Sequence, residues 1–497
     1  MFRALLSVGG FTLLSRLTGF VRDIIMASVL GRGLLSDAFM VAFRLPNHFR
    51  TIFAEGAYNA AFVPLYSGMS RDEAAAFSRN MLGWQIVTQI VLFVAALIAM
   101  PWVVAALAPG FTERPEQMAL AVELTRITFV YLLCIAVVTH LGGMLNAEKK
   151  FWAAAAAPIC LNIAMATSLS FAFIYPTAAH AAAWGVAVGG VAEVVLLIVA
   201  TGVVRLPVLP SWPAVTENVR TFALRFGPAA LGAAGVQIAL LADTMLASLM
   251  TVGEITSLYY ADRVNQLPMG VVGVALGTVL LPELSRAVSK GDEGRAAHSF
   301  NRATELGLLL TLPCLAAFFV FPDAIMEGLF ARGAFDLAAA KASSGVLVAY
   351  AVGLLAFVTL RTVTPLFHAR GDTRTPVIAT VASIAINLGV KVVLIFGFSF
   401  GAIGLALGTS IGAWVNLAIL GAIASGRGFM VLHERLTGGG PRIACAAAFA
   451  AAVAWLVAAP LDDALATVTF LRAEIYLAVL GVITLASYGV ALLGFGW

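Results

Sequence analysis

Long apolar runs follow one another along almost the whole chain, separated by short segments that carry charged residues, proline or glycine. A helix needs about 20 residues to cross a hydrocarbon core about 30 Å thick. The runs are continuous and do not alternate with polar residues at every second position, which favours helices over the strands of a membrane barrel. We therefore expect an all-α polytopic membrane protein with fourteen transmembrane helices. Their ranges are 4–30, 36–66, 80–108, 118–146, 153–175, 181–203, 218–250, 255–283, 297–321, 339–367, 375–396, 401–424, 442–459 and 472–494.

The composition agrees with this class of protein. Charged residues make up only 11% of the 497 residues, whereas a soluble domain carries about 25%. Cys134, Cys160, Cys314 and Cys445 occur singly, without the spacing of a disulfide framework or a zinc site, so no metal or cofactor is predicted. The net charge of +4 is small for this length and does not indicate a nucleic-acid partner.

The distribution of basic residues predicts the orientation. The first apolar run is interrupted by Arg16 and Arg22 and lacks a signal-peptide cleavage motif, so we expect it to be retained as a membrane span. Outside the spans, most Lys and Arg residues, such as Lys149 and Arg205, lie on the side that holds both termini. Because such residues concentrate in cytoplasmic loops, both termini are predicted to be cytoplasmic in a protein of the cytoplasmic (inner) membrane.

Three short motifs recur at nearly constant spacing. The pairs are DIIMAS from Asp23 with DTMLAS from Asp243, FRLP at Arg44 with DRVNQLP at Arg263, and FVPLYS at Pro64 with LLPELS at Pro282. Their offsets of 220, 219 and 218 residues indicate an internal duplication. An even number of spans separates equivalent elements, so the halves should share one orientation, related by an axis along the membrane normal.

The duplication predicts the domain organisation. We expect a six-helix N-lobe over 1–204, a cytoplasmic linker over 205–220, and a six-helix C-lobe over 221–425. Two additional helices then occupy 426–497.

Charged residues inside the apolar runs are costly, because a central Arg or Asp disfavours membrane insertion by about 2.5–3.5 kcal/mol. They include Arg16, Arg22, Asp23, Asp37, Arg44, Arg50, Glu55, Asp243, Asp262 and Arg263. Asp37, Arg44, His48 and Glu55 are separated by seven, four and seven residues, which places them on one face of an ideal helix. Such a face is not expected to contact lipid.

Two interpretations of these charges remain open. Buried Arg and Asp residues can pair only to fix the packing of helices. Alternatively, arginines from both halves line a water-filled, cationic cavity for an anion, because the planar guanidinium group suits phosphate as well as carboxylate. We favour a phosphate or diphosphate site.

A separate group lies near the seventh and eleventh runs. Asp243 and Asn387 could form part of a cation site, but Lys391 lies one helical turn beyond Asn387, where its ammonium group could act as an internal counter-ion. We favour an Asp243–Lys391 pair.

Several motifs resemble the MurJ/MviN family of lipid II flippases, within the multidrug/oligosaccharidyl-lipid/polysaccharide exporter superfamily. They are SRLTGFVRD, SDAFMVAFRLPNHFRTIFAEGAYNAAFVP, YYADRVNQLPMGVVGVALGTVLLPELS and LFARGAF, in the order and spacing of the family over about residues 1–425. The resemblance implies transport of lipid II, undecaprenyl diphosphate bearing a disaccharide-pentapeptide, to the outer leaflet for peptidoglycan biosynthesis. Membrane lipids and cell-wall synthesis proteins would be its other partners.

The resemblance also implies particular site residues. The central cationic cavity of the family maps onto Arg16, Arg22, Arg50 and Arg263, with Asp37 and Glu55 nearby. Arg44 takes the family's usual basic position before Leu-Pro-Asn, and the last two helices correspond to those that form a groove for the lipid tail. Lys391 departs from the sodium-binding pattern of some relatives, which favours membrane potential or protons as the driving force.

Two other functions fit parts of the sequence. An enzyme acting on polyprenyl phosphates would also need arginines near the bilayer, but it should have clustered acids for magnesium or a nucleophile with a base. The adjacent acidic pair, Asp462 and Asp463, is instead expected in an outer loop. A drug exporter or another flippase of the same superfamily shares the expected architecture, and only the long first-half motif argues against it.

Overall fold

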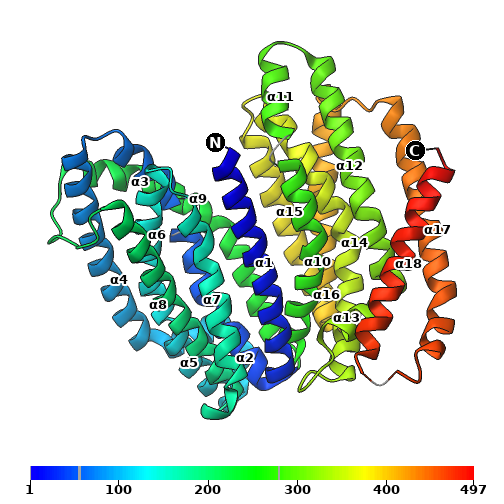
Figure 1. Ribbon diagram of the computed structural model, residues 1–497, viewed down its shortest axis with the longest axis horizontal. Coiled ribbons are helices and arrows are strands. Elements are labelled where there is room, and N and C mark those ends of the chain that lie inside the picture. Colours follow the sequence, from blue (N-terminus) through cyan, green and yellow to red (C-terminus); the bar gives the residue numbers. More distant parts are fainter. Residues whose placement is uncertain (1, 54–56, 278–279, 469, 497) are drawn as a thin grey trace. The chain divides into compact units, whose positions relative to one another are not determined.

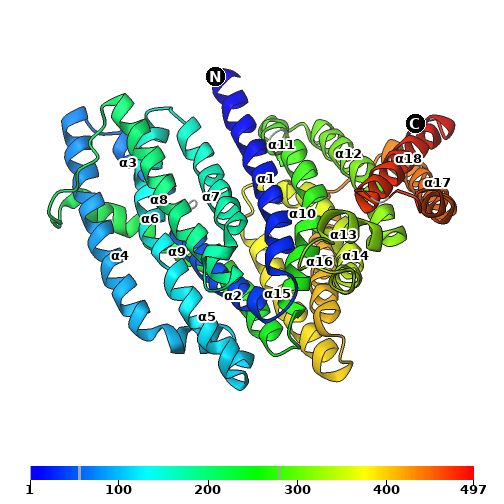
Figure 2. The same ribbon diagram turned by 60° about the horizontal axis from the view of Figure 1, so that its bottom comes forward.

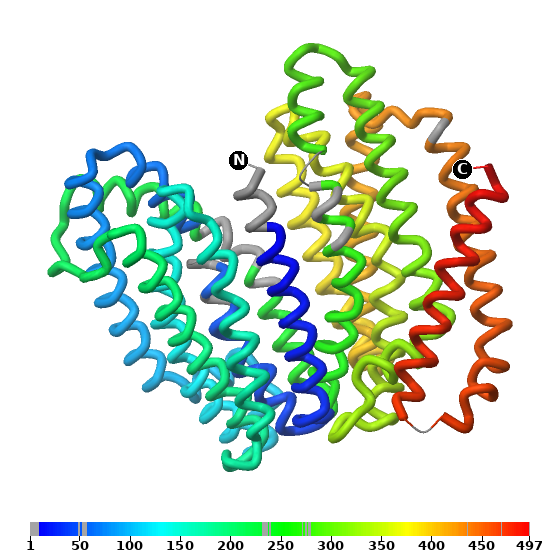
Figure 3. Tube along the Cα trace, viewed as in Figure 1, coloured from blue at the N-terminus to red at the C-terminus, as the bar shows by residue number. Residues whose placement is uncertain are grey.

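Helices account for the regular structure of this chain, as the continuous apolar runs predict. The computed structural model describes residues 2–53, 57–277, 280–468 and 470–496. Within these ranges the regular elements are helices, apart from an isolated β-bridge between Arg332 and Phe335. Figure 1 shows the helices, and Figure 3 follows the Cα trace from α1 to α18.

The chain divides into two compact units. Unit 1 is Met1–Thr256 with Arg332–Phe335, and unit 2 is Ser257–Ala331 with Asp336–Trp497. The helices of unit 1 are α1 (Phe2–Leu30), α2 (Leu34–Phe53), α3 (Ala57–Ser67), α4 (Arg71–Leu107), η1 (Pro109–Glu113), α5 (Pro115–Thr128), α6 (Val130–Ala147), α7 (Trp152–Ser170), η2 (Ala172–Ile174), α8 (Ala178–Val204) and α9 (Glu217–Ser248). Helix α10 (Glu254–Gly277) begins in unit 1 and continues in unit 2. The remaining helices, all in unit 2, are α11 (Leu280–Ser289), α12 (Glu293–Val320), α13 (Pro322–Phe330), α14 (Leu337–His368), α15 (Arg374–Val392), the π-helical turn η3 (Val393–Gly397), α16 (Gly401–Gly426), α17 (Glu434–Ala464) and α18 (Arg472–Gly494).

Ten helical segments of the described chain are long and apolar enough to cross a membrane. They are α4, α5 with α6, α7, α8, α12, α14, α15 with η3, α16, α17 and α18. The chain is thus a multi-pass helical protein by length and composition. The predicted runs at 36–66 and 255–283 each hold two helices, α2 with α3 and α10 with α11.

In unit 1, small residues bring α7 and α8 together. A Cβ atom at Gly185 would lie 2.8 Å from the Cα of Met165, and one at Gly189 would lie 2.9 Å from the Cα of Leu161. Two glycines four residues apart therefore let the backbone of α8 approach that of α7, as in small-residue contacts between membrane helices. Helix α7 also packs on α1, and α8 packs on α6.

In unit 2, α16 packs against both α14 and α15, and α12 contacts both α14 and α17. The last two helices lie side by side, which Figure 2 also shows, and the hydroxyl of Tyr488 on α18 donates to the main-chain oxygen of Leu309 on α12 at 2.9 Å. The two additional helices predicted from the sequence are therefore packed onto unit 2 through α12 and α13.

The linker after α8 is hydrogen-bonded to α4. Asn80 exchanges two hydrogen bonds of 2.8 Å with the main chain of Ala214, and the Ser211 N–H donates to the main-chain oxygen of Arg79 at 2.9 Å. The chain then enters α9, which packs on α3, α2 and α4. The boundary between the compact units falls after Thr256. The lobes that the sequence repeat predicts, the second beginning at residue 221, stay a prediction.

We expect Gly185→Ala to lower the thermal unfolding midpoint of the purified protein, because the added methyl group would meet the backbone of α7. Gly202→Ala, on the same helix, is the matched control. Nothing lies within 4 Å of a Cβ atom there, and alanine is favoured over glycine in a helix by about 1 kcal/mol. The control should keep or raise the wild-type midpoint. Equal midpoints for the two variants would contradict the close packing of α7 on α8.

Candidate functional site

The charged stretch SRLTGFVRD lies in α1 and is held by α7. Arg22 and Asp23 are both buried, and Arg22 Nη2 lies 2.7 Å from Asp23 Oδ1. Arg22 Nη1 donates to Asn162 Oδ1 at 2.9 Å, while Asn162 Nδ2 donates to the Ser15 main-chain oxygen at 3.0 Å and to Thr18 Oγ1 at 3.2 Å. The ion pair has no net charge, and Asn162 supplies further hydrogen bonds, so the cost of burying these charges is offset. This contact agrees with the first interpretation above, in which buried charges pair to fix helix packing.

Arg16 differs from Arg22 in its surroundings. Its side chain is exposed in the isolated chain, six residues before Arg22 on α1. Among the described residues it has no recorded hydrogen bond or ion pair. Its guanidinium group therefore remains available to an anion.

Asp37, in the first turn of α2, accepts hydrogen bonds from the start of α10. The Thr256 N–H and Oγ1 donate to Asp37 Oδ1 at 2.9 and 2.6 Å, and the Gly253 N–H donates to Oδ2. A carboxylate at this position satisfies free N–H groups at the N-terminus of a helix and interacts favourably with its dipole. Beside it, Arg32 Nη2 lies 3.2 Å from Glu254 Oε1. The geometry therefore adds a capping role to the site role predicted for Asp37.

A tight turn of the LFARGAF motif contacts the end of α1. The Ala334 N–H donates to the Ser28 main-chain oxygen at 2.7 Å, and Arg332 pairs with Phe335 across the turn. Gly31 and Gly333 have φ values of +67° and +59°, a conformation that glycine adopts at little cost. Asp37, Arg32 and this turn therefore connect α1, α2, the start of α10 and residues 332–335, all within unit 1.

The second half of α2 carries the other predicted charges. Arg44 is half-buried, and its Nη1 donates to Thr244 Oγ1 on α9 at 3.0 Å. A neutral hydroxyl leaves the charge of this guanidinium group uncompensated at that contact. Glu55 and the side chain of His48 lie outside the described residues.

Arg50, near the end of α2, belongs to a cluster that the sequence analysis missed. It interacts electrostatically with Glu193 on α8 and with Tyr131 on α6. Tyr131 donates from its hydroxyl to Glu193 Oε2 at 3.2 Å, and both residues are only 1% exposed. A glutamate within the apolar run at 181–203 was visible in the sequence and could have identified this cluster, because ionisable residues inside spans are rarely incidental. Asn162 had no comparable signal.

In unit 2, the predicted site residues are Asp262 and Arg263 on α10. Both are half-buried. Arg263 Nη2 donates to the Tyr259 hydroxyl at 3.1 Å, and its Cζ lies 4.8 Å from the centre of that ring. Asp262 accepts a hydrogen bond from Gln266 one turn later.

Lys391 is 1% exposed on α15, facing α16. A Cβ atom at Gly408 would overlap the Cγ of Lys391, and one at Gly412 would lie 2.8 Å from the Cβ of Asn387. Glycines on α16 thus make room for both polar side chains on α15. Asp243 belongs to unit 1, so the pair that we predicted for Asp243 and Lys391 joins residues of different units and stays a prediction.

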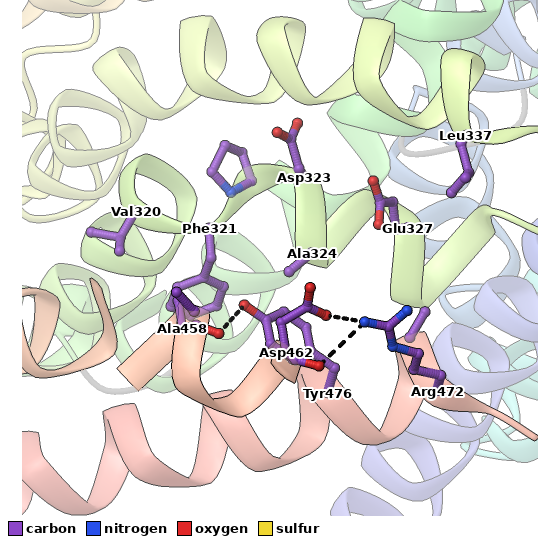
Figure 4. A pocket seen from close by; sticks show the side chains of 13 residues that line it. Val320, Phe321, Asp323, Ala324, Glu327, Leu337, Ala458, Asp462, Arg472 and Tyr476 are labelled. Atoms are coloured by element: carbon purple, nitrogen blue, oxygen red, sulfur yellow. Dashed lines mark hydrogen bonds and ion pairs between the residues drawn. The ribbon is translucent and has the colours of Figure 1, made fainter. Parts of the chain in front are cut away.

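A cavity of about 610 Å³ lies in unit 2 between α13, α17 and α18 (Figure 4). Asp323, Glu327 and Asp462 contribute carboxylates, and Arg472 Nη2 donates to Asp462 Oδ1 at 2.8 Å. Partial burial, with Asp323 and Asp462 nearby, raises the pKa of Glu327. Asp462 lies in the last turn of α17, whereas the sequence analysis expected it in a loop. The excess of carboxylates makes this cavity unsuitable for a diphosphate.

Because the folded protein raises the pKa of Glu327, its protonated form is favoured by folding, and stability is lost as pH rises above the ordinary glutamate value of 4.5. We expect Glu327→Gln to remove this loss. The thermal midpoint of the variant minus that of the wild type should increase as pH rises above 4.5, and become constant once Glu327 is deprotonated in the folded protein. Glu116→Gln, at an exposed glutamate of α5, is measured in parallel as the surface control. A constant difference for Glu327→Gln would contradict its burial among carboxylates.

Comparisons with known proteins identify the family. The family model described as lipid II flippase MurJ matches residues 26–477. A probable lipid II flippase MurJ of Rhizobium meliloti (strain 1021) is 39% identical over 472 residues, covering 92% of this chain and 88% of the relative. The lipid II flippase MurJ of Burkholderia cenocepacia is 33% identical over 443 residues, covering 84% and 83%.

Solved structures agree in fold. A lipid II flippase MurJ in an inward closed conformation has a TM-score of 0.80 at 23% identity and covers 97% of both chains. An inward-facing multidrug transporter of the MATE family has a TM-score of 0.65 at 18% identity, covering 83% of this chain and 94% of its own. From the extent of the family match and the identity of these relatives, we conclude that this chain belongs to the lipid II flippase MurJ family.

Proposed function

We propose that this chain carries lipid II from the inner to the outer leaflet of the cytoplasmic membrane by alternating access. The observation that carries this proposal is the family match over residues 26–477, supported by curated relatives named as lipid II flippases. The chain is accordingly a transporter and not an enzyme. The substrate carries a diphosphate that must pass through the hydrocarbon core of the membrane. The free-energy cost of removing this group from water is prohibitive unless the protein supplies compensating charges.

We also propose fourteen membrane spans. The ten apolar segments would be joined by α1, α2, α9 and α10, which have 29, 20, 32 and 24 residues. At about 1.5 Å per residue, the shortest of these reaches about 30 Å, enough for the hydrocarbon core. Three of these helices, α1, α2 and α10, carry the arginines of the predicted site. Both termini would be cytoplasmic.

The order of the helices supports the proposed duplication. Long and short helices alternate in the same way after α1 and after α9: α2, α3 and α4 correspond to α10, α11 and α12, and α7 and α8 correspond to α15 and α16. Packing recurs as well, since α8 contacts α6 and α7 while α16 contacts α14 and α15. The two lobes would therefore descend from one six-helix ancestor.

The proposed diphosphate site would use the arginines that the sequence analysis named. Arg16 and Arg44 have no carboxylate partner at their described contacts, and Arg263 donates to a neutral phenol. Arg50 would join them by leaving Glu193, and Arg22 by exchanging Asp23 for phosphate. Asp37 and Glu55 would keep the site from holding its anion too tightly for release.

With the termini in the cytoplasm, the contacts between α1, α2 and residues 249–256 would lie at the periplasmic end. Each is a hydrogen bond or ion pair whose partners can exchange for water. We propose that they close the outer side while lipid II enters from the inner leaflet, and that they break when the transporter opens outward.

We expect Arg16→Ala and Arg263→Ala each to reduce lipid II transport in proteoliposomes by about 10- to 100-fold. A charge-assisted hydrogen bond contributes about 1.5–3 kcal/mol, which is of that order. Arg71→Ala, at the exposed start of α4, is the control and should transport normally. Full transport by both site variants would rule out the diphosphate site. Transport of drugs in preference to lipid II would rule out the proposed substrate.

A cross-link across the outer contacts should stop transport. We would replace Arg32 and Glu254 by cysteine in a chain whose four native cysteines are removed, and join them with a short, cleavable thiol reagent. Cleavage of the reagent should restore activity. The same pair of changes at Ser70 and Glu73, which contact each other at the start of α4, should leave transport unaffected. Continued transport after complete cross-linking at 32 and 254 would show that this contact need not open.

A further inference from the structure

The cluster of Glu193, Tyr131 and Arg50 contains a carboxylate to which no role has been assigned. Glu193 lies on α8, and Tyr131 approaches it from α6. Gly190 makes this approach possible, because a Cβ atom there would lie 2.8 Å from Cδ2 of the tyrosine ring. The absence of a side chain at 190 thus lets the Tyr131 hydroxyl reach the carboxylate three residues further on.

Among the described residues that interact with Glu193, one carries a positive charge that can compensate the carboxylate. Tyr131 and Cys134 face it from α6, and Cys160 interacts with it from α7. These three groups are neutral. Among the described residues, Arg50 of α2 is the charged group recorded as interacting with Glu193. The charge balance of this cluster therefore depends on where the Arg50 side chain points.

Arg50 is positioned to have two alternative partners. Its side chain is half-buried, whereas Glu193 is only 1% exposed, so an incoming anion would reach the guanidinium group before the carboxylate. If Arg50 turns to an incoming diphosphate, Glu193 loses its compensating charge. A buried carboxylate without a partner takes up a proton in preference to remaining charged.

We propose that Glu193 is the internal counter-ion of Arg50 and binds one proton when Arg50 turns to the diphosphate of lipid II. This inference rests on the proposed function. The proton comes from water and converts the carboxylate to a carboxylic acid, while the Tyr131 hydroxyl continues to donate to the other oxygen. On release of the lipid, Arg50 returns to Glu193 and the proton leaves to water.

The proposal makes lipid II binding dependent on pH. A binding step that takes up one proton loses up to tenfold in affinity for each unit of pH increase. The diphosphate of lipid II is esterified at both ends, so it has no proton of its own to exchange near neutral pH. Proton uptake on binding therefore reports on the protein.

Proton uptake can be measured by titration calorimetry with lipid II and the full chain in nanodiscs, in buffers of different ionisation enthalpy. At about pH 8.5, where Glu193 beside Arg50 is ionised before binding, we expect close to one proton per bound lipid for the wild type and none for Glu193→Gln, whose side chain is already neutral. Tyr131→Phe keeps the carboxylate and should still take up a proton. Glu305→Gln, at a buried glutamate of α12, is the matched control and should behave as the wild type.

The outcomes separate this inference from the proposed function. Binding by the wild type without proton uptake would overturn the inference even if Glu193→Gln failed to fold, and so would equal uptake by the wild type and Glu193→Gln. In both cases the proposed function would stand. Failure of the folded wild type to bind lipid II would overturn both.

Discussion

The cost of placing charge in hydrocarbon governs this protein more than any other constraint. The helices that carry its arginines reduce that cost in different ways. Arg22 has a carboxylate neighbour and an amide clasp from α7, whereas Arg44 and Arg263 use neutral hydroxyls. A carboxylate partner neutralises a guanidinium group, and a hydroxyl only orients it. The Arg22–Asp23 pair and its amide clasp also hold α1 against α7.

The sequence was sufficient to predict what depends on hydropathy and on local spacing. Helical class and the order of the helices follow from patterns within a few turns. The partners of the buried charges do not, because Arg22 meets Asn162 at a separation of 140 residues and Asp37 meets Thr256 at 219. Spacing predicts which face of a helix carries a charge, but only the packing of helices decides what that face meets.

The repeat and the compact units need not coincide. A duplication would repeat the order of the helices, but the contacts between helices also depend on how the connecting segments are fixed. The linker is bonded to α4 through Asn80 and Ser211, so α9 continues along α2, α3 and α4 of unit 1. Helix α9, which would begin the second half of the proposed duplication, therefore contributes Thr244 to the surroundings of Arg44. Sequence symmetry alone could not predict this exchange.

The counter-ion role of Glu193 bears on what drives transport. A diphosphate diester carries two negative charges, and moving each one outward across a membrane that is negative inside releases about 2.3 kcal/mol per 100 mV. A proton held on Glu193 while the lipid crosses would reduce the charge moved from two to one. The free energy that the membrane potential supplies to transport would then be halved. Arg50 could, however, bind the diphosphate without leaving the Glu193 carboxylate charged and unpaired in the interior. Because an unpaired buried charge costs about 3–5 kcal/mol, the exchange favours transport at ordinary potentials.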